Sequence, residues 1–235
     1  MGDRTVRHFA LAAVSVVVLG QCAPQCAPIP ASPAPLTGVA PAPPTTLTMT
    51  FDGAGPSAPR IGLIGDSTLA SIRWSGTDAP LRQWNYTFDA ESCRRTITAS
   101  CHGPDGYAPA NVVDVMNRLR GQLGTVLVMM VGANDPVARF GEGVDVVLGE
   151  ARAQGIATVI WLTVHGADDR NGILAQRSQE SGGFLVVADW AAFSAPHPEW
   201  TNADGLHINS AGAAVLSQFI ADHVGGVLAG GPAGA

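Results

Sequence analysis

Three short polar segments of this chain combine residue types that can carry out nucleophilic chemistry. They are residues 65–67 (Gly-Asp-Ser), 132–135 (Gly-Ala-Asn-Asp) and 204–207 (Asp-Gly-Leu-His). A serine hydroxyl is a weak nucleophile that needs a base beside it, and a histidine base needs its other ring nitrogen held by an acid. The residue types therefore predict a catalytic triad of Ser67, His207 and Asp204.

Asn134, in the second segment, can add electrostatic stabilisation to this triad. Its side-chain amide is a donor suited to the negative charge that develops on a carbonyl oxygen under attack. Each segment alone is also an ordinary turn sequence. The occurrence of all three in this order, two of them directly after apolar runs, favours a catalytic site over three unrelated turns.

Short apolar runs that alternate with amphipathic stretches must position these residues. The runs at 61–64, 125–131, 157–164 and 184–188 predict strands, and 85–88 is a weaker strand candidate. Apolar residues at helical spacing predict helices over 111–120, 142–154 and 210–224. Strands that are apolar on both faces indicate a parallel sheet covered on both sides. The predicted fold is a doubly wound α/β sandwich of roughly five strands, with ligands bound beyond their carboxyl ends.

The composition of the 235 residues excludes several other classes of function. The formal net charge is −6 and every basic residue is arginine, which argues against a nucleic-acid binder and against docking on anionic lipid. The chain has no Gly-x-Ser-x-Gly elbow, no glycine-rich phosphate loop and no His-Glu-x-x-His zinc motif.

The N-terminal quarter of the sequence is typical of an export signal followed by a linker. Two arginines precede an uncharged, mostly apolar run at 9–19, so we expect a signal peptide over residues 1–22. Residues 23–59 hold ten of the 17 prolines and predict a Pro/Ala/Thr-rich linker, followed by one domain at 60–229 and a flexible tail at 230–235. The expected location is secreted or cell envelope, and a lipid anchor at Cys22 is the less favoured alternative.

The three polar segments resemble the first, third and fifth blocks of the SGNH/GDSL hydrolase family, over roughly residues 60–224. The resemblance implies a flavodoxin-like three-layer α/β/α sandwich. It also implies Ser67 as nucleophile, Asn134 in the oxyanion hole, and Asp204 and His207 as acid and base. The family's second block supplies a glycine N–H to the oxyanion hole, beside the N–H of Ser67. By spacing this glycine should lie within residues 101–110, where Gly106 is the first choice and Gly103 the alternative. The segment 91–101 is similar to exported actinobacterial SGNH proteins.

Cys93 and Cys101 enclose seven residues, and in an exported chain we expect them to form a disulfide. Two unpaired cysteines are the alternative. A metal site built from these cysteines and His102 lacks a fourth ligand, so no metal is expected. Arg94 and Arg95 either line the cleft or are surface charges, and His165 and Trp200 are further candidates for lining it.

Taken together, these features predict an exported serine esterase that works through an acyl-enzyme without a metal or organic cofactor. Short-chain acyl esters, including O-acetylated envelope carbohydrate, are the expected substrates. Two alternatives stay open: an O-acyltransferase to a sugar acceptor, and a catalytically silent carbohydrate-binding module. The partner is a small-molecule or carbohydrate ester rather than nucleic acid. No transmembrane segment is expected after signal removal, and the oligomeric state is not readable from the sequence.

Overall fold

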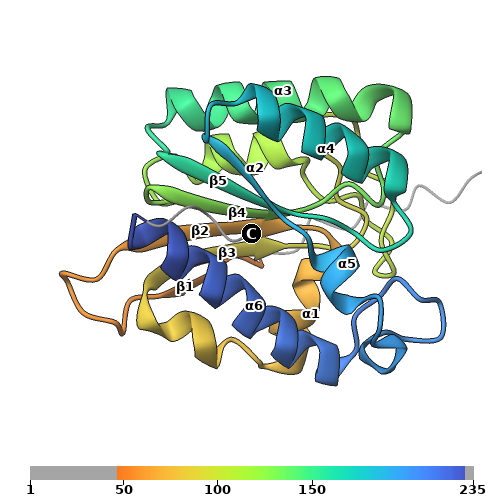
Figure 1. The fold of residues 1–235 in the computed structure, drawn as a ribbon, viewed down its shortest axis with the longest axis horizontal. Coiled ribbons are helices and arrows are strands. Elements are labelled where there is room, and N and C mark those ends of the chain that lie inside the picture. The colour runs from red at the N-terminus through yellow and green to blue at the C-terminus, as the bar shows by residue number, and fades with distance from the viewer. Residues whose placement is uncertain (1–46, 231–235) are drawn as a thin grey trace, which may run out of the picture. The chain divides into compact units, whose positions relative to one another are not determined.

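The computed structural model describes residues 47–230, which form an α/β fold around a six-stranded sheet (Figure 1). The predicted signal peptide, the lipid-anchor candidate Cys22 and most of the predicted linker and tail lie outside the described residues. The strands are β1 (Met49–Phe51), β2 (Arg60–Gly65), β3 (Asn85–Ala90), β4 (Val126–Met130), β5 (Thr158–Leu162) and β6 (Leu185–Ala188). The helices are α1 (Ser67–Ser75), η1 (Ala79–Gln83), α2 (Val112–Arg118), α3 (Val137–Ala153), α4 (Asp168–Glu180), α5 (Trp190–Ser194), η2 (Pro198–Trp200) and α6 (Ser210–Leu228).

The sheet has the strand order β1-β3-β2-β4-β5-β6, and its last five strands are parallel. Without β1 this is the flavodoxin-like order, which places the switch point of the winding between β2 and β4. The predicted three-layer fold with about five parallel strands is therefore confirmed.

The sixth strand, β1, pairs antiparallel with β3 at the edge of the sheet, with Met49 opposite Phe88. Its residues fall inside the range 23–59 that the sequence analysis assigns to a linker, so the boundary of the folded domain lies earlier than predicted. Three residues are too few to show a strand periodicity, and the pairing partner lies far along the chain.

Helices cover both faces of the sheet because the central strands are apolar on both sides. Every residue of β4 (Val-Leu-Val-Met-Met) is buried. One core lies between the sheet and α1 and α6, and the other lies between the sheet and α2, α3 and α4. Figure 1 shows these helices as two separate layers above and below the strands. Because β2 to β6 run parallel, their carboxyl ends lie at one common edge of the sheet.

The C-terminal helix α6 is the one helix of the described part that is long and apolar enough to cross a membrane by length and composition. In this fold it packs against α1 and the sheet. Its buried residues recur at helical spacing along one face, from Gly212 and Ala213 through Leu216 and Ile220 to Val224. This pattern is that of an amphipathic core helix.

Candidate functional site

The Gly65–Ser67 turn joins β2 to α1 and presents Ser67 at the first position of the helix. Asp66 is the N-cap, and its Oδ1 accepts hydrogen bonds from the N–H of Thr68 at 2.9 Å and from its hydroxyl at 2.7 Å. A Cβ at Gly65 would lie 2.7 Å from the carbonyl oxygen of Met130 and 2.4 Å from Leu69, so the turn needs glycine. The Ser67 N–H has no acceptor within the described residues and lies at the positive end of the helix dipole.

Ser67, His207 and Asp204 form one continuous chain of hydrogen bonds. Ser67 Oγ lies 3.0 Å from His207 Nε2, and His207 Nδ1 lies 2.7 Å from Asp204 Oδ2. The other oxygen of Asp204 accepts the N–H groups of Leu206 and His207, both at 2.9 Å. The structure therefore brings together the three residues predicted as the triad, although Ser67 and His207 are 140 positions apart in the sequence.

The hydrogen bond from His207, followed by those from the two backbone N–H groups, lowers the pKa of Asp204 to about 2. The carboxylate therefore stays ionised over the whole range in which a histidine titrates. An ionised acid at this position holds the imidazole and stabilises its protonated form. The side chains of Asp204 and His207 are 51% and 42% exposed, so the triad opens at the surface rather than in a deep cavity.

A short antiparallel loop fixes the position of His207. Thr201 forms an isolated β-bridge with Ile208, and the N–H of Asn202 donates to the carbonyl of His207 at 2.8 Å. Asn209 then caps α6 by accepting the N–H groups of Ala211 and Gly212. The base thus lies two residues before the N-cap of α6, which limits its movement.

The side chain of Asn134 points toward the Gly65–Ser67 turn. Its Nδ2 lies 3.5 Å from Asp66 Oδ2 and 3.4 Å from the carbonyl of Arg94. Both contacts are long, so the amide N–H₂ keeps donor capacity for another acceptor. Its main-chain carbonyl accepts a 2.8 Å hydrogen bond from Arg95 Nε, which anchors the turn after β4. Asn134 therefore lies beside the turn that carries Ser67.

Two buried aspartates, Asp66 and Asp135, stabilise the turns that carry Ser67 and Asn134 by accepting hydrogen bonds. Asp66 is fully buried and Asp135 nearly so, and burial raises the pKa of both carboxyls. Asp135 Oδ1 accepts the N–H of Thr96 at 3.0 Å and its hydroxyl at 2.6 Å. These bonds tie the loop after β3 to the turn after β4, a link that the sequence analysis did not identify.

The glycines predicted for the oxyanion hole are not available as donors. The N–H of Gly106 donates to the carbonyl of Gly103 at 3.0 Å, and the N–H of Gly103 donates to the carbonyl of Tyr107 at 2.9 Å. Gly106 is also exposed, in a left-handed turn conformation. The prediction of Gly106, with Gly103 as the alternative, is therefore corrected: both N–H groups serve a turn of their own loop.

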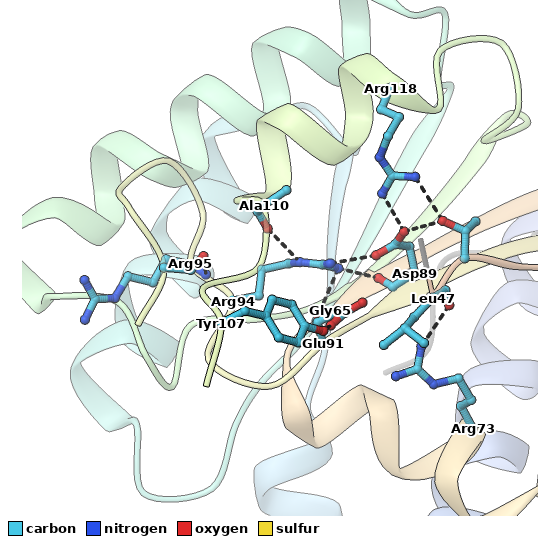
Figure 2. A network of polar contacts seen from close by, with 12 residues as sticks. Leu47, Gly65, Arg73, Asp89, Glu91, Arg94, Arg95, Tyr107, Ala110 and Arg118 are labelled. Atoms are coloured by element: carbon cyan, nitrogen blue, oxygen red, sulfur yellow. Dashed lines mark hydrogen bonds and ion pairs between the residues drawn. The ribbon is translucent and has the colours of Figure 1, made fainter. Parts of the chain in front are cut away.

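Arg94 does not line the cleft, because it is buried in an ion pair with Asp89 (Figure 2). Its guanidinium also donates to the carbonyls of Gly65 and Ala110, so it joins β2, β3 and the segment before α2. Arg95 braces the loop after β3 by donating to the carbonyls of Asn134 and Ala99. Adjacent arginines read as surface charge in a sequence, which is why the buried one was not recognised.

The predicted disulfide between Cys93 and Cys101 is confirmed, with the two Cα atoms 5.1 Å apart. It closes the loop directly after β3, next to Asn134. Among residues 47–230, no three His, Cys, Asp or Glu side chains gather as a metal site.

A partly exposed aromatic group lies in the segment between β6 and α6, which also carries the base. The ring of Trp200 stacks on His197 with centroids 3.8 Å apart and on Phe193 with centroids 5.9 Å apart. Phe193 is 47% exposed. We call these three residues the aromatic shelf. His165 lines a shallow depression with Asp168 and Asp189, beyond the ends of β5 and β6.

Comparison with known proteins supports the fold. No protein-family profile and no curated protein matches this sequence. Among solved structures, a protein from Slackia heliotrinireducens classed among the SGNH hydrolases is similar, with a TM-score of 0.53 and 21% identity, over 71% of this chain and 98% of that chain. A second solved structure has a TM-score of 0.56 and 14% identity, over 73% and 99% of the two chains.

A family 3 carbohydrate esterase from Clostridium thermocellum covers 75% of this chain and 99% of its own, but the TM-score of 0.47 and identity of 13% are too low to carry an argument. The structural likeness therefore shows that this chain has an SGNH-hydrolase-type α/β fold.

Proposed function

We propose that this protein is a serine ester hydrolase in which Ser67 is the nucleophile, His207 the general base and Asp204 the acid that orients it. The observation that carries the proposal is the hydrogen-bond chain from Ser67 Oγ through both nitrogens of His207 to Asp204. An SGNH-hydrolase-type fold with this chain at the carboxyl edge of its sheet fits ester hydrolysis better than silent binding, since a binding module has no need of a nucleophile beside its base.

The proposed reaction proceeds in two steps through an acyl-enzyme. His207 Nε2 takes the proton of Ser67 as Oγ attacks the ester carbonyl, and the protonated histidine then gives that proton to the leaving alcohol. Water, deprotonated by His207, attacks the acyl-serine and releases the acid. The Ser67 N–H and the Asn134 amide donate to the oxyanion in both steps, aided by the helix dipole of α1.

We infer a small acyl group on a large polar alcohol as the substrate. The half-exposed acid and base leave the triad open to an ester carried on a bulky molecule. The aromatic shelf lies in the segment between β6 and α6 that also carries His207, and flat aromatic faces offer apolar contact to the C–H face of a sugar ring. Together with the expected export of the chain, this favours acetylated envelope carbohydrate.

Hydrolysis of p-nitrophenyl esters of increasing chain length tests the reaction. Wild type should hydrolyse the acetate fastest, and Ser67→Ala should lose this activity. Ser75→Ala is the matched control, because it makes the same substitution at the other end of the same helix. Equal rates for wild type and Ser67→Ala would contradict the proposal.

Release of acetate from acetylated xylan and from methyl acetate tests the substrate class. Phe193→Ala should raise KM for acetylated xylan and leave KM for methyl acetate unchanged. Transfer of the acyl group to added xylan, in place of its release as free acid, would instead identify a transferase.

A further inference from the structure

Cys93 has a backbone conformation that cysteine rarely adopts. Its φ is +70°, and it is the sole non-glycine residue with positive φ in the part of the chain that the structure describes. A side chain in this left-handed region is disfavoured because Cβ approaches the following carbonyl oxygen. Something in the surrounding structure must hold the residue there.

The turn that contains Cys93 lies beside the nucleophile turn. It spans Glu91 to Arg94, directly after β3, and is closed by the N–H of Arg94 donating to Glu91 at 3.4 Å. The N–H of Glu91 donates at 3.2 Å to the carbonyl of Gly65, the residue that begins the Gly-Asp-Ser turn. The carbonyl of Arg94 in turn contacts the amide of Asn134. The Cys93 turn thus lies between the two elements that carry the oxyanion donors already assigned.

The N–H of Cys93 has no acceptor among the described residues. The N–H of Ser67 likewise has no acceptor there, whereas the N–H groups of Gly103 and Gly106 each donate to a carbonyl of their own loop. Cys93 is only partly buried, so its N–H is open to water or to a ligand. A free N–H next to a nucleophile turn is the feature required of an oxyanion donor.

The disulfide supplies the restraint on Cys93. It ties the residue to Cys101, whose Sγ lies 3.9 Å from Asn134 Oδ1. The enclosed loop is held further by Arg95, whose side chain donates to the carbonyl of Ala99 and whose backbone N–H donates to Ser100 Oγ. Figure 2 shows the other side of the turn, where the Tyr107 hydroxyl reaches Glu91 and Arg94 lies in its buried ion pair. The disulfide therefore joins Cys93 to Cys101, and the sulfur of Cys101 contacts the side chain of Asn134.

We propose that the Cys93–Cys101 disulfide is a positioning element of the oxyanion hole, which holds the Cys93 N–H as its third donor and braces the Asn134 amide. This inference rests on the proposed esterase function. Reduction of the bridge by dithiothreitol, which supplies two electrons and two protons and yields two thiols, should lower kcat for p-nitrophenyl acetate. KM should change little, because an oxyanion donor acts on charge that exists only in the transition state.

Two double variants that both lack the bridge test the proposal. Cys93→Gly/Cys101→Ser places glycine at the left-handed position, where it is favoured, and Cys93→Ala/Cys101→Ser places alanine there, where it is strained. The alanine variant should lose about 100-fold in kcat, the effect of removing one oxyanion donor. The glycine variant should keep a kcat at least tenfold above it, with the same KM.

Circular dichroism of both variants shows whether each is folded, so that kcat is compared between folded proteins. Equal kcat values for the two folded variants, or a loss confined to KM, would overturn this inference and leave the triad in place. A wild type without Ser67-dependent hydrolysis would overturn the proposed function and this inference with it. The two failures are therefore distinguishable.

Discussion

Replacing Arg94 with methionine should strongly destabilise the fold, because it leaves a buried carboxylate without its main partner. The side chains of Arg94 and Asp89 are each 2% exposed, and Arg94 Nη2 lies 2.6 Å from Asp89 Oδ1 (Figure 2). Methionine keeps much of the volume and removes the charge. The variant therefore tests the ion pair, together with the guanidinium hydrogen bonds to the carbonyls of Gly65 and Ala110, rather than packing.

The size of the effect follows from what still contacts Asp89. Removing one partner of a buried pair costs about 3–5 kcal/mol. Arg118 and Thr48 remain on Asp89 Oδ2, at 2.7 and 2.5 Å, so we expect the lower end, about 3 kcal/mol. For a domain of this size that is a fall in Tm of about 6–12 °C.

Arg118→Met is the matched control, since it removes the other guanidinium from the same carboxylate. Arg118 is 37% exposed, so solvent screens its pair with Asp89, and the loss should be about 1 kcal/mol or less. Urea denaturation at pH 7 measures both free energies of unfolding. A loss for Arg94→Met no greater than for Arg118→Met would refute the reasoning.

The pH dependence gives a second readout of the same pair. Burial raises the pKa of Asp89, but the charge of Arg94 and hydrogen bonds from Thr48 and both arginines outweigh it and lower the pKa. The stabilisation is thus present above the unfolded pKa of about 4 and is lost as the pH falls through the lower folded value. Without Arg94 less of the burial is compensated, which raises the pKa of Asp89, so the deficit of the variant should be smaller at pH 4 than at pH 7.

Three further predictions concern the catalytic site. Ser67→Ala and His207→Ala should each remove most activity and the double variant should be little worse, since the two residues act as one unit; multiplicative losses in kcat would speak against the triad. Asn134→Ala should lower kcat about 100- to 1,000-fold with little change in KM, whereas a purely structural role would lower Tm and leave kcat near wild type in the folded fraction. Because the pKa of Asp204 is about 2, its stabilising contribution persists down to about pH 4 and is lost only below it, so protonation of this carboxyl should add no step to the fall of kcat/KM from pH 8 to 5; a slope of two in the logarithmic plot would contradict this.

The parallel sheet and the triad could be predicted from the sequence because both depend on local patterns. The buried strands β2, β4 and β5 are apolar runs in the sequence. Ser67 lies shortly after the end of β2, and Asn134 lies shortly after the end of β4. The helix α4 was not predicted, because Leu174 is its one fully buried residue and leaves no apolar periodicity. The edge strand β1 depends on a distant partner.

The third oxyanion donor could not be found from the sequence because the usual signal points elsewhere. The family resemblance and the spacing pointed to a glycine, Gly106 or Gly103, whereas in the structure the residue beside the nucleophile turn that has a left-handed conformation is Cys93. A disulfide can hold a cysteine in such a conformation, and no propensity scale records that. The burial of Arg94 was missed for a similar reason, since its partner Asp89 lies within a strand and the pairing depends on the fold.

Covalent labelling of Ser67 is the most direct test of the central claim. The protein is treated with a fluorophosphonate, which phosphonylates an activated serine, and the modified peptide is identified by mass spectrometry. The account predicts a single adduct on Ser67 that is absent in Ser67→Ala and formed much more slowly in His207→Ala, with Ser75→Ala labelled like wild type. An adduct on another serine, or labelling of Ser67 at the same rate without His207, would contradict it.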